Sequence, residues 1–497
     1  MNRREFLKGI GFGAAALALP AGMSAAQKPA GGSAGKKVNF VFFLIDDMGW
    51  RDAGCYGSTF YETPNIDRLA SEGMRFTDAY AACPVCSPTR ASIMTGKYPA
   101  RLNLTNFLVG RRWPKNSPIL PPEWRHQMPL EEVTIAEALK EAGYVTCFIG
   151  KWHLGKEPYY PEHQGFDINI GGTRSGAPKS HFWPQWGDNP PIEGRPGEYL
   201  ADRLTDESLK FLEANHDKPF LLYLSHYAVH TPLESKKELA EKYKAKAESL
   251  PPAKGPRFIP EGNRQARRVQ DHAVYAGMIQ SVDESVGRVM RKLDELGVAD
   301  NTVVIFMSDN GGLSTSEGSP TSNVPLRAGK GWLYEGGIRE PMIIKWPRVV
   351  RAGSVCNEPV TSTDFYPTML EMADLALRPG QHCDGVSLAP LLQQKGKLKR
   401  KAIYWHYPHY GNQGGRPGGA VRAGDYKLIE FYEDNRIELY NLKEDISEKH
   451  DLSARMPEKT AELRRMLHEW RKAVDARMPK PNPEYGAKAD RNKIRKT

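Results

Sequence analysis

The sequence contains no apolar run long enough to span a bilayer. The most apolar N-terminal stretch, Ile10 to Leu19, is short and rich in Gly and Ala, whereas a spanning helix needs about 20 apolar residues. Cysteine is scarce as well: six among 497 residues exclude a small disulfide-stapled scaffold. Four of them are expected to be buried thiols, or to form at most one or two bridges: Cys55, Cys147, Cys356 and Cys383.

Positive charge is in excess, since the formal net charge is +10. A basic protein suits anionic partners, which include nucleic acid and sulfated glycans. The basic runs Lys397–Lys401 and Lys488–Lys496 are interpreted as solvated loops or tails rather than binding patches. We therefore expect no nucleic-acid partner.

Residues 1–26 have the pattern of an export signal. Arg3 and Arg4 precede the short apolar run and resemble a twin-arginine signal, and Ser24-Ala25-Ala26 offers small residues for cleavage. The alternative is an uncut membrane anchor. Export by the twin-arginine machinery predicts a periplasmic or secreted protein without an integral membrane segment. Residues 27–36 are rich in Gly, Ala and Lys and are interpreted as a linker between the signal and the first domain.

Four apolar runs predict buried strands of a mostly parallel sheet. Val38 to Ile45 is almost continuously apolar, as expected for a parallel strand that is covered on both faces. Similar runs and amphipathic helices alternate with it, which predicts an α/β domain over 37–385. The other strands are expected at 144–149, 220–224 and 302–307, and the helices at 65–73, 134–143, 200–214 and 274–296.

The character of the sequence changes after residue 385. Short strands joined by turns are expected at 402–405, 420–422, 426–431 and 437–440, followed by a helix over 456–478. They predict a smaller α+β domain with an antiparallel sheet over 386–497. Residues 157–200 are rich in Pro, Gly, Trp and His and are interpreted as a long substrate-facing loop. The polar stretch that runs to about residue 263 is expected to cover the surface.

Polar side chains follow each of these predicted strands. In open α/β sheets, ligands bind at the carboxyl ends of the strands. Three carboxylates and an amide are hard oxygen donors, which favours Ca²⁺, with Mg²⁺ as the stricter alternative. The groups at the four strand ends are Asp46-Asp47, Lys151/His153, His226/His230 and Asp309-Asn310.

The stretch Cys83–Gly96, CPVCSPTRASIMTG, predicts an anion site that contains a cysteine. Pro88 suits the first turn of a helix and Gly96 can end it. Cys86 would then lie just before a helix N-terminus, with Arg90 one turn further on as an oxyanion clamp. A helix-capping loop with a buried thiol, a redox pair with Cys83, or half a zinc site remain alternatives, although the chain has no second C-x-x-C motif.

The C-x-P-x-R motif with a later T-G resembles the signature of the type I sulfatases of the alkaline phosphatase superfamily. Further matches, in family order, are DD after the first strand, GKWHLG, HTP, and SDNGG with the later GKG. The resemblance implies an alkaline phosphatase-like fold and hydrolysis of sulfate esters. It also implies that a maturation enzyme oxidises Cys86 to formylglycine (3-oxoalanine).

Residue by residue, the resemblance implies two sets. Ca²⁺ would be bound by Asp46, Asp47, Asp309 and Asn310 with the modified Cys86, and the remaining pocket positions are Arg90, Lys151, His153, His230 and Lys330. One hydroxyl of the aldehyde hydrate would attack sulfur, helped by the metal and Asp309. The other would lose its proton to His153 and expel sulfate. Either His230 or Lys330 could protonate the departing alcohol.

The substrate expected from this resemblance is a sulfated polysaccharide or oligosaccharide. A rim of aromatic and basic residues could bind the sugar: Arg174, His181, His406, His409 and Arg416. The alternative is that these residues only pack the second domain. Competing functions are an aryl sulfate hydrolase, a phosphate or phosphonate ester hydrolase of the same superfamily, and a non-enzymatic Ca²⁺-dependent binder of sulfated glycans.

Overall fold

The computed structural model describes residues 37–485, except 109, 111–112 and 115. The described residues belong to one compact unit. The expected export signal, the linker and the basic run Lys488–Lys496 lie outside the described residues, so they stay predictions. Within the described part, none of the helices combines the length and the apolar character needed to cross a membrane.

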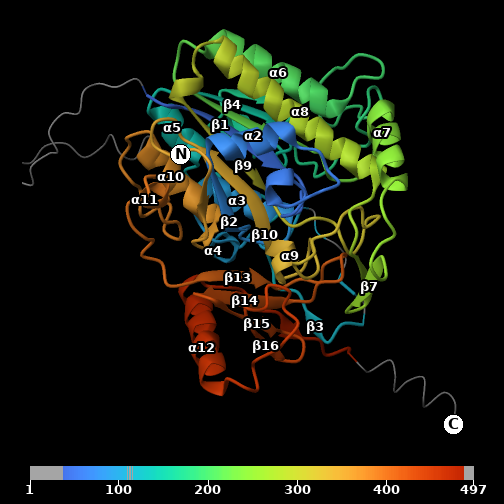
Figure 1. Ribbon diagram of the computed structural model, residues 1–497. Coiled ribbons are helices and arrows are strands. Elements are labelled where there is room, and N and C mark those ends of the chain that lie inside the picture. The colour runs from blue at the N-terminus through green and yellow to red at the C-terminus, as the bar shows by residue number, and fades with distance from the viewer. Residues whose placement is uncertain (1–36, 109, 111–112, 115, 486–497) are drawn as a thin grey trace, which may run out of the picture. The chain divides into compact units, whose positions relative to one another are not determined.

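A large mixed sheet occupies the centre of this unit (Figure 1). Its strand order is β11-β2-β10-β9-β1-β6-β4-β5, and β12 pairs with β2. The stretch β9-β1-β6-β4-β5 is parallel, whereas β10 runs antiparallel to both β9 and β2. The strands are β1 (Asn39–Ile45), β2 (Met74–Tyr80), β4 (Val145–Gly150), β5 (Ile168–Ile170), β6 (Phe220–Ser225), β9 (Thr302–Ser308), β10 (Arg339–Lys345), β11 (Ser354–Cys356) and β12 (Val360–Thr361).

Helices cover both faces of this sheet, because successive side chains of a strand point to opposite faces. Val41, Phe43 and Ile45 of β1 pack with α2 (Pro64–Glu72), α6 (Leu200–Asn215) and α8 (Ala273–Glu295). Phe40, Phe42 and Leu44 point the other way. They pack with α3 (Cys86–Thr95), α4 (Pro99–Leu102), α5 (Ile135–Glu141), α10 (Phe365–Met372) and α11 (Ala389–Leu392). The continuous apolar run of β1 is therefore the sequence of a strand buried on both sides, as predicted.

A second, antiparallel sheet has the order β13-β14-β15-β16 and is drawn in orange and red in Figure 1. One face packs on α12 (Pro457–Ala473) through Leu428 and Trp470. The other face packs on the large domain, where Trp405 meets Tyr80 edge to face. Its strands are β13 (Ile403–Tyr407), β14 (Gly418–Ala423), β15 (Tyr426–Phe431) and β16 (Ile437–Asn441). The predicted second sheet is confirmed, and the boundary near residue 385 stays a prediction.

Two parts of the structure differ from the expectation. The strand β2 has no long apolar run, because Arg75, Thr77 and Asp78 interrupt it. The presumed surface stretch before residue 263 contains α7 (Lys237–Glu248), which packs on α8, and the first strand of a hairpin. The remaining short elements are β3 (Ile119–Leu120) paired with β17 (Lys480–Pro481), the hairpin of β7 (Phe258–Glu261) and β8 (Arg264–Arg267), α9 (Glu335–Ile338), and 3₁₀ turns at Gly54–Tyr56, Pro161–His163, Ala299–Asn301 and Ser362–Asp364.

A buried ion network joins the two sheets. Lys427 of β15 is fully buried, and its Nζ lies 2.9 Å from Glu335 Oε1 and 2.8 Å from Glu448 Oε1. Glu335 also accepts a hydrogen bond from Tyr80 and pairs with Arg339. Two carboxylates at such close range need the ammonium between them, because buried charges are costly unless they are paired.

We therefore expect Lys427→Ala to destabilise the protein by about 3–5 kcal/mol, the usual cost of removing one partner from a buried ion pair. The measurement is the shift of the chemical unfolding transition followed by fluorescence. Lys443→Ala, at an exposed position, is the matched control and should shift the transition by less than about 0.5 kcal/mol. Equal effects of the two substitutions would contradict the role given to the buried lysine.

Candidate active site

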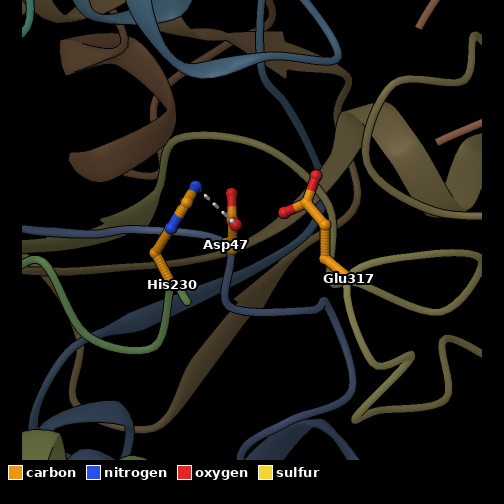
Figure 2. Close-up of side chains that lie close together, drawn as sticks. All are labelled: Asp47, His230 and Glu317. Atoms are coloured by element: carbon orange, nitrogen blue, oxygen red, sulfur yellow. Dashed lines mark ion pairs between the residues drawn. The ribbon is translucent and has the colours of Figure 1, made fainter. Parts of the chain in front are cut away.

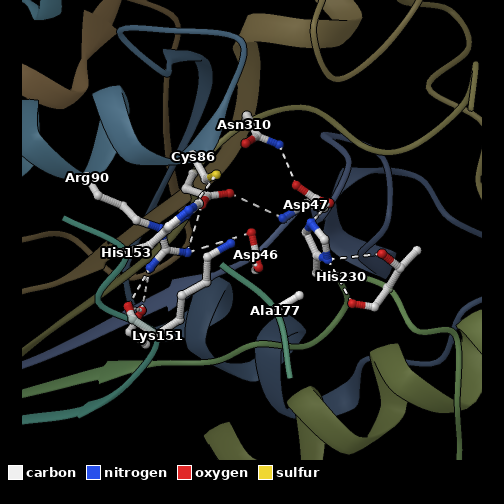
Figure 3. Close-up of polar contacts among 12 residues, drawn as sticks. Asp46, Asp47, Cys86, Arg90, Lys151, His153, Ala177, His230 and Asn310 are labelled. Atoms are coloured by element: carbon white, nitrogen blue, oxygen red, sulfur yellow. Dashed lines mark hydrogen bonds and ion pairs between the residues drawn. The ribbon is translucent and has the colours of Figure 1, made fainter. Parts of the chain in front are cut away.

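The functional side chains meet at the carboxyl edge of the parallel strands (Figure 3). β1 ends in Asp46 and Asp47, and the neighbouring β9 ends in Asp309 and Asn310. The register pairs Ile45 with Ser308, so Asp46-Asp47 and Asp309-Asn310 leave the sheet at the same level. The proximity expected from parallel topology is thus present in the structure.

Three buried carboxylates form the centre of the site. Asp46, Asp47 and Asp309 are each 0% exposed, and each offers one oxygen within 4.8 Å of the others. Asn310 donates from Nδ2 to Asp47 Oδ1 at 2.7 Å. Asn310 Oδ1 and Asp46 Oδ1 are buried without a hydrogen-bond partner in the described chain. Such a set of oxygen donors fits a hard divalent cation of the Ca²⁺ or Mg²⁺ class.

Cationic side chains surround these carboxylates. Lys151 Nζ lies 2.5 Å from Asp46 Oδ2, and Lys330 Nζ lies 2.7 Å from Asp47 Oδ2. Arg90 Nε donates to Asp309 Oδ2 at 2.9 Å. The site therefore carries cations that neutralise the carboxylates and can also face an anionic substrate group.

The helix α3 positions Cys86 and Arg90 at this edge of the sheet. The structure corrects one detail of the expectation: Cys86 is the first residue of the helix rather than the residue before it, because the chain stays extended only up to Val85. Gly96 ends the helix in the left-handed conformation, at φ 67°, as predicted. Arg90 is one turn further on, and its Nη1 donates to the backbone of Lys151 at 2.8 Å and to Ser225 Oγ at 2.7 Å.

Cys86 faces His153, with 3.3 Å between Sγ and Nδ1. The other ring nitrogen, Nε2, contacts the carbonyl oxygen of Leu108. Because a carbonyl only accepts, Nε2 carries the proton and Nδ1 presents its lone pair to the sulfur. Burial and the Lys151 charge hold the pKa of His153 well below its usual value, so the ring is a neutral acceptor at pH 7.

The backbone around His153 is not extended, which corrects the expectation that Lys151 and His153 share one strand face. Gly150 has a φ of 99° and His153 a φ of 58°. This bend sends Lys151 to Asp46 and His153 to Cys86. The loop at 157–200, which was expected to face the substrate, packs against the His153 ring at Gly176. A Cβ at Gly176 would lie only 2.4 Å from His153 Cε1.

His230 and Lys330 lie on the Asp47 side of the site. His230 Nδ1 donates to the carbonyl of Thr231 at 2.8 Å, and its Nε2 lies 3.6 Å from Asp47 Oδ2. Burial and the Lys330 charge lower the pKa of His230 to about 4. Burial would lower the pKa of Lys330, but Asp47 outweighs it and the pKa lies well above the usual value.

Burial raises the pKa of Asp46 well above its usual value, against the effect of Lys151. It acts in the same direction on Asp47, but Lys330 and His230 outweigh it, so the pKa of Asp47 lies well below its usual value. Burial also raises the pKa of the Cys86 thiol. An unmodified Cys86 is therefore a poor thiolate nucleophile at neutral pH.

Most of the expected rim residues do not line the pocket. His406 is buried between Tyr432 and the backbone of Arg477, and His409 is bonded to Thr105. This burial corrects the expectation that these two histidines form an exposed sugar rim: they pack the second sheet. Arg416 is exposed and pairs with Glu433 at 3.4 Å.

The two expected rim residues of the loop at 157–200 also differ in exposure: one is buried and the other is exposed. His181 is 1% exposed, and its Nε2 donates to the backbone carbonyl of His230 at 3.2 Å, so it supports the pocket from behind. Arg174 is exposed. His226, which also follows a strand, points into the core and hydrogen-bonds Ser285 of α8.

The sequence reading missed two contributors. Ser225 accepts from Arg90 and donates to the backbone of Lys151 at 2.8 Å, which ties the ends of β4 and β6 together. Glu317 places its carboxylate beside Asp47 and His230 (Figure 2). Ser225 is a polar residue at the end of an apolar strand, and this pattern could have identified it as a site residue from the sequence. Nothing in the sequence around Glu317 distinguishes it from a surface acid.

Comparison with known proteins decides the family. The model of the Sulfatase family matches residues 38–375. This chain belongs to the sulfatase family. A second model, N-sulphoglucosamine sulphohydrolase, C-terminal, matches residues 328–475.

Several relatives are similar over most of their length. A sulfatase of Formosa agariphila is 34% identical, covering 85% of this chain and 86% of the relative. Human arylsulfatase A is 32% identical, covering 84% and 77%. The crystal structure of Ps i-CgsB in complex with k-i-k-neocarrahexaose is 30% identical, with a TM-score of 0.72, and covers 88% of this chain and 93% of that one. The sulfatase is thus a sulfuric ester hydrolase with the alkaline phosphatase-like fold.

The geometry of Arg90 predicts that Arg90→Lys lowers kcat/KM for sulfate esters about 10- to 100-fold, because hydrogen bonds to charged groups are worth about 1.5–3 kcal/mol. A lysine cannot reach Asp309, Ser225 and the Lys151 backbone at once. The measurement is initial-rate kinetics of sulfate release. Arg68→Lys, on the exposed face of α2, should leave kcat/KM unchanged, and full activity of the Arg90 variant would refute this role.

Proposed function

We propose that this sulfatase hydrolyses O-sulfate esters of a sulfated polysaccharide or oligosaccharide, with a formylglycine made from Cys86 and with bound Ca²⁺. The observation that carries the proposal is the position of Cys86. Its Sγ is at the first turn of α3, 3.3 Å from His153 Nδ1. Burial raises the pKa of its thiol, and the thiol is close enough to Asp309 and Asp46 for their charges to raise that pKa further. The similarity to Ps i-CgsB, which was crystallised in complex with k-i-k-neocarrahexaose, supports the glycan substrate class.

The Cys86 side chain stands where a formylglycine hydrate would carry two hydroxyls on one carbon. One hydroxyl attacks sulfur and the sugar alcohol leaves. The second hydroxyl then loses its proton. The bond between the carbon and the sulfated oxygen breaks, sulfate leaves with that oxygen, and the aldehyde is restored. His153 Nδ1 carries a lone pair that faces the side chain of residue 86. His153 is therefore suited to take the proton of the second hydroxyl.

The metal, when bound, supplies Lewis-acid stabilisation of charge at the sulfuryl oxygens. Asp46, Asp47, Asp309 and Asn310 would hold it together with the modified Cys86. Three carboxylates carry one negative charge more than a divalent ion neutralises, and the positive charges of Arg90, Lys151 and Lys330 more than offset it. These cations are also the chain's own groups for orienting the sulfate ester.

The departing sugar alcohol needs a proton, since an alkoxide is a poor leaving group. The sequence left His230 and Lys330 as equal candidates. The pKa of His230 is lowered to about 4, whereas that of Lys330 is raised. Lys330 therefore holds a proton at neutral pH, and we favour it as the donor.

The proposal includes the protein's processing. A formylglycine-generating enzyme would oxidise Cys86, and the pattern of residues 1–26 predicts export through the twin-arginine machinery to the periplasm or medium. Because that route carries folded proteins, oxidation of Cys86 would precede export.

The proposal predicts that the peptide with residue 86 loses about 18 Da when the protein is produced in a host that makes formylglycine, as the conversion of thiol to aldehyde requires. Mass spectrometry of the digested protein measures it. Cys83→Ala, at the neighbouring buried thiol, should keep the mass loss and sulfate release, while Cys86→Ala abolishes both. An unmodified Cys86 in a competent host, or glycan binding without turnover, would contradict the proposal.

The proposed Ca²⁺ site predicts that the ion stabilises the folded protein. Ca²⁺ at a hundred times its dissociation constant should stabilise the protein by about 2.7 kcal/mol, measured as a rise of the melting temperature by calorimetry. Asn310→Ala removes a donor whose oxygen has no hydrogen-bond partner among the described residues and should weaken this rise. Glu162→Gln, in the exposed cluster of Glu157, Glu162 and His163, should not. A rise that the first substitution leaves intact would place the ion elsewhere.

A further inference from the structure

Glu317 lies beside Asp47 and His230 (Figure 2). One of its carboxylate oxygens, an Asp47 oxygen and a His230 nitrogen all lie within 4.8 Å of one another. The residue is half-buried, so its carboxylate is open to a bound substrate. It follows Asn310 by seven positions, on the loop after β9.

The second domain holds this carboxylate in place. Oε1 of Glu317 accepts from Asn412 Nδ2 at 2.5 Å and from Gln413 Nε2 at 2.8 Å. The backbone carbonyl of Gln413 in turn accepts from Thr315 Oγ1 and Trp332 Nε1. The side-chain amides of Asn412 and Gln413 therefore donate to the same oxygen of Glu317. The other oxygen, Oε2, has no hydrogen-bond partner in the described chain.

The position of Glu317 relative to the reaction is given by its neighbours. Cys86 and His153 lie on the attacking side of the site, while His230 and Lys330 lie on the Asp47 side. In-line displacement places the departing ester oxygen opposite the nucleophile. The ring carbon that bears the sulfate, and the hydroxyl on the next carbon, would then enter beside His230, where Glu317 lies.

We infer that Glu317 is a specificity-determining residue, which accepts a hydrogen bond from a sugar hydroxyl on the carbon next to the sulfated one. The inference rests on the proposed function and adds a requirement to it. A vicinal hydroxyl is within hydrogen-bond distance of the ester oxygen, so one sugar can engage the Asp47–His230 side and Glu317 together. A carboxylate is an acceptor only, and a charged acceptor gives the stronger hydrogen bond.

The same charge selects against a second anionic group at that position. A sulfate or carboxylate on the neighbouring carbon would place like charges at close range in a mostly buried site, which is costly. Glu317 therefore favours a monosulfated unit with a free neighbouring hydroxyl over a vicinally disulfated one. This is discrimination by a repulsive element as well as by an attractive contact.

The test uses Glu317→Gln and Glu317→Ala in the mature, metal-loaded enzyme. The substrates are O-monosulfated methyl hexosides that cover each ring position. The best of these is then compared with its analogue that lacks the neighbouring hydroxyl and with its vicinally disulfated form. Inhibition by inorganic sulfate, which carries no sugar hydroxyl, reports on the sulfate pocket alone. Glu469→Gln removes a carboxylate at an exposed site of α12 and is the matched control.

We expect Glu317→Gln to lower kcat/KM for the hydroxylated substrate at least about 10-fold, and Glu317→Ala up to about 100-fold, the range for a hydrogen bond to a charged group. The deoxy analogue should change less than about 3-fold, and the disulfated form should gain relative to the monosulfated one. The inhibition constant of sulfate and the Ca²⁺ content should stay those of the wild type.

Three results would overturn the inference. An equal loss on the hydroxylated and deoxy substrates would show that Glu317 does not read the hydroxyl. A weaker sulfate inhibition with less bound metal would make it part of the cation site. No change at all would remove it from the pocket. If the wild-type enzyme releases sulfate from none of the hexosides, the proposed glycan function fails, and the inference falls with it.

Discussion

Three carboxylates buried at one sheet edge are the constraint on which the site depends. Asp46, Asp47 and Asp309 are fully buried and close together, and such an arrangement is stable only if positive charge surrounds it. Arg90, Lys151 and Lys330 provide it, and each comes from a different part of the chain. The anionic cluster thus fixes where α3, the end of β4 and the loop before α9 must lie.

The second sheet has a role beyond covering the large domain. Its Lys427 neutralises Glu335, which follows Lys330 by five residues, while the loop between β13 and β14 supplies the amides that hold Glu317. Both contacts fix loops that carry pocket residues. The smaller domain therefore acts on the site through buried polar contacts, although the histidines of β13 and its following loop face inward and not toward the substrate.

The sequence allowed the central sheet and the strand-end residues to be predicted because these depend on local patterns. An apolar run followed by Asp46-Asp47 or Asp309-Asn310 reports both a buried strand and a polar edge. β2 escaped this reasoning because charged residues interrupt it and its partners β10 and β11 are distant in sequence. The inward direction of His406 and His409 depends on long-range packing, and so does the site position of Glu317. No local pattern encodes these.

The bend at Lys151–His153 shows how backbone geometry separates two chemical functions. The left-handed conformations at Gly150 and His153 let side chains two positions apart point to different groups. Lys151 binds Asp46, where negative charge must be balanced, and His153 turns to Cys86 with its proton held on the far nitrogen by Leu108. An extended segment would send both side chains to one face. The unfavourable backbone at His153 is therefore a cost of keeping a neutral proton acceptor beside Cys86 while Lys151 points to Asp46.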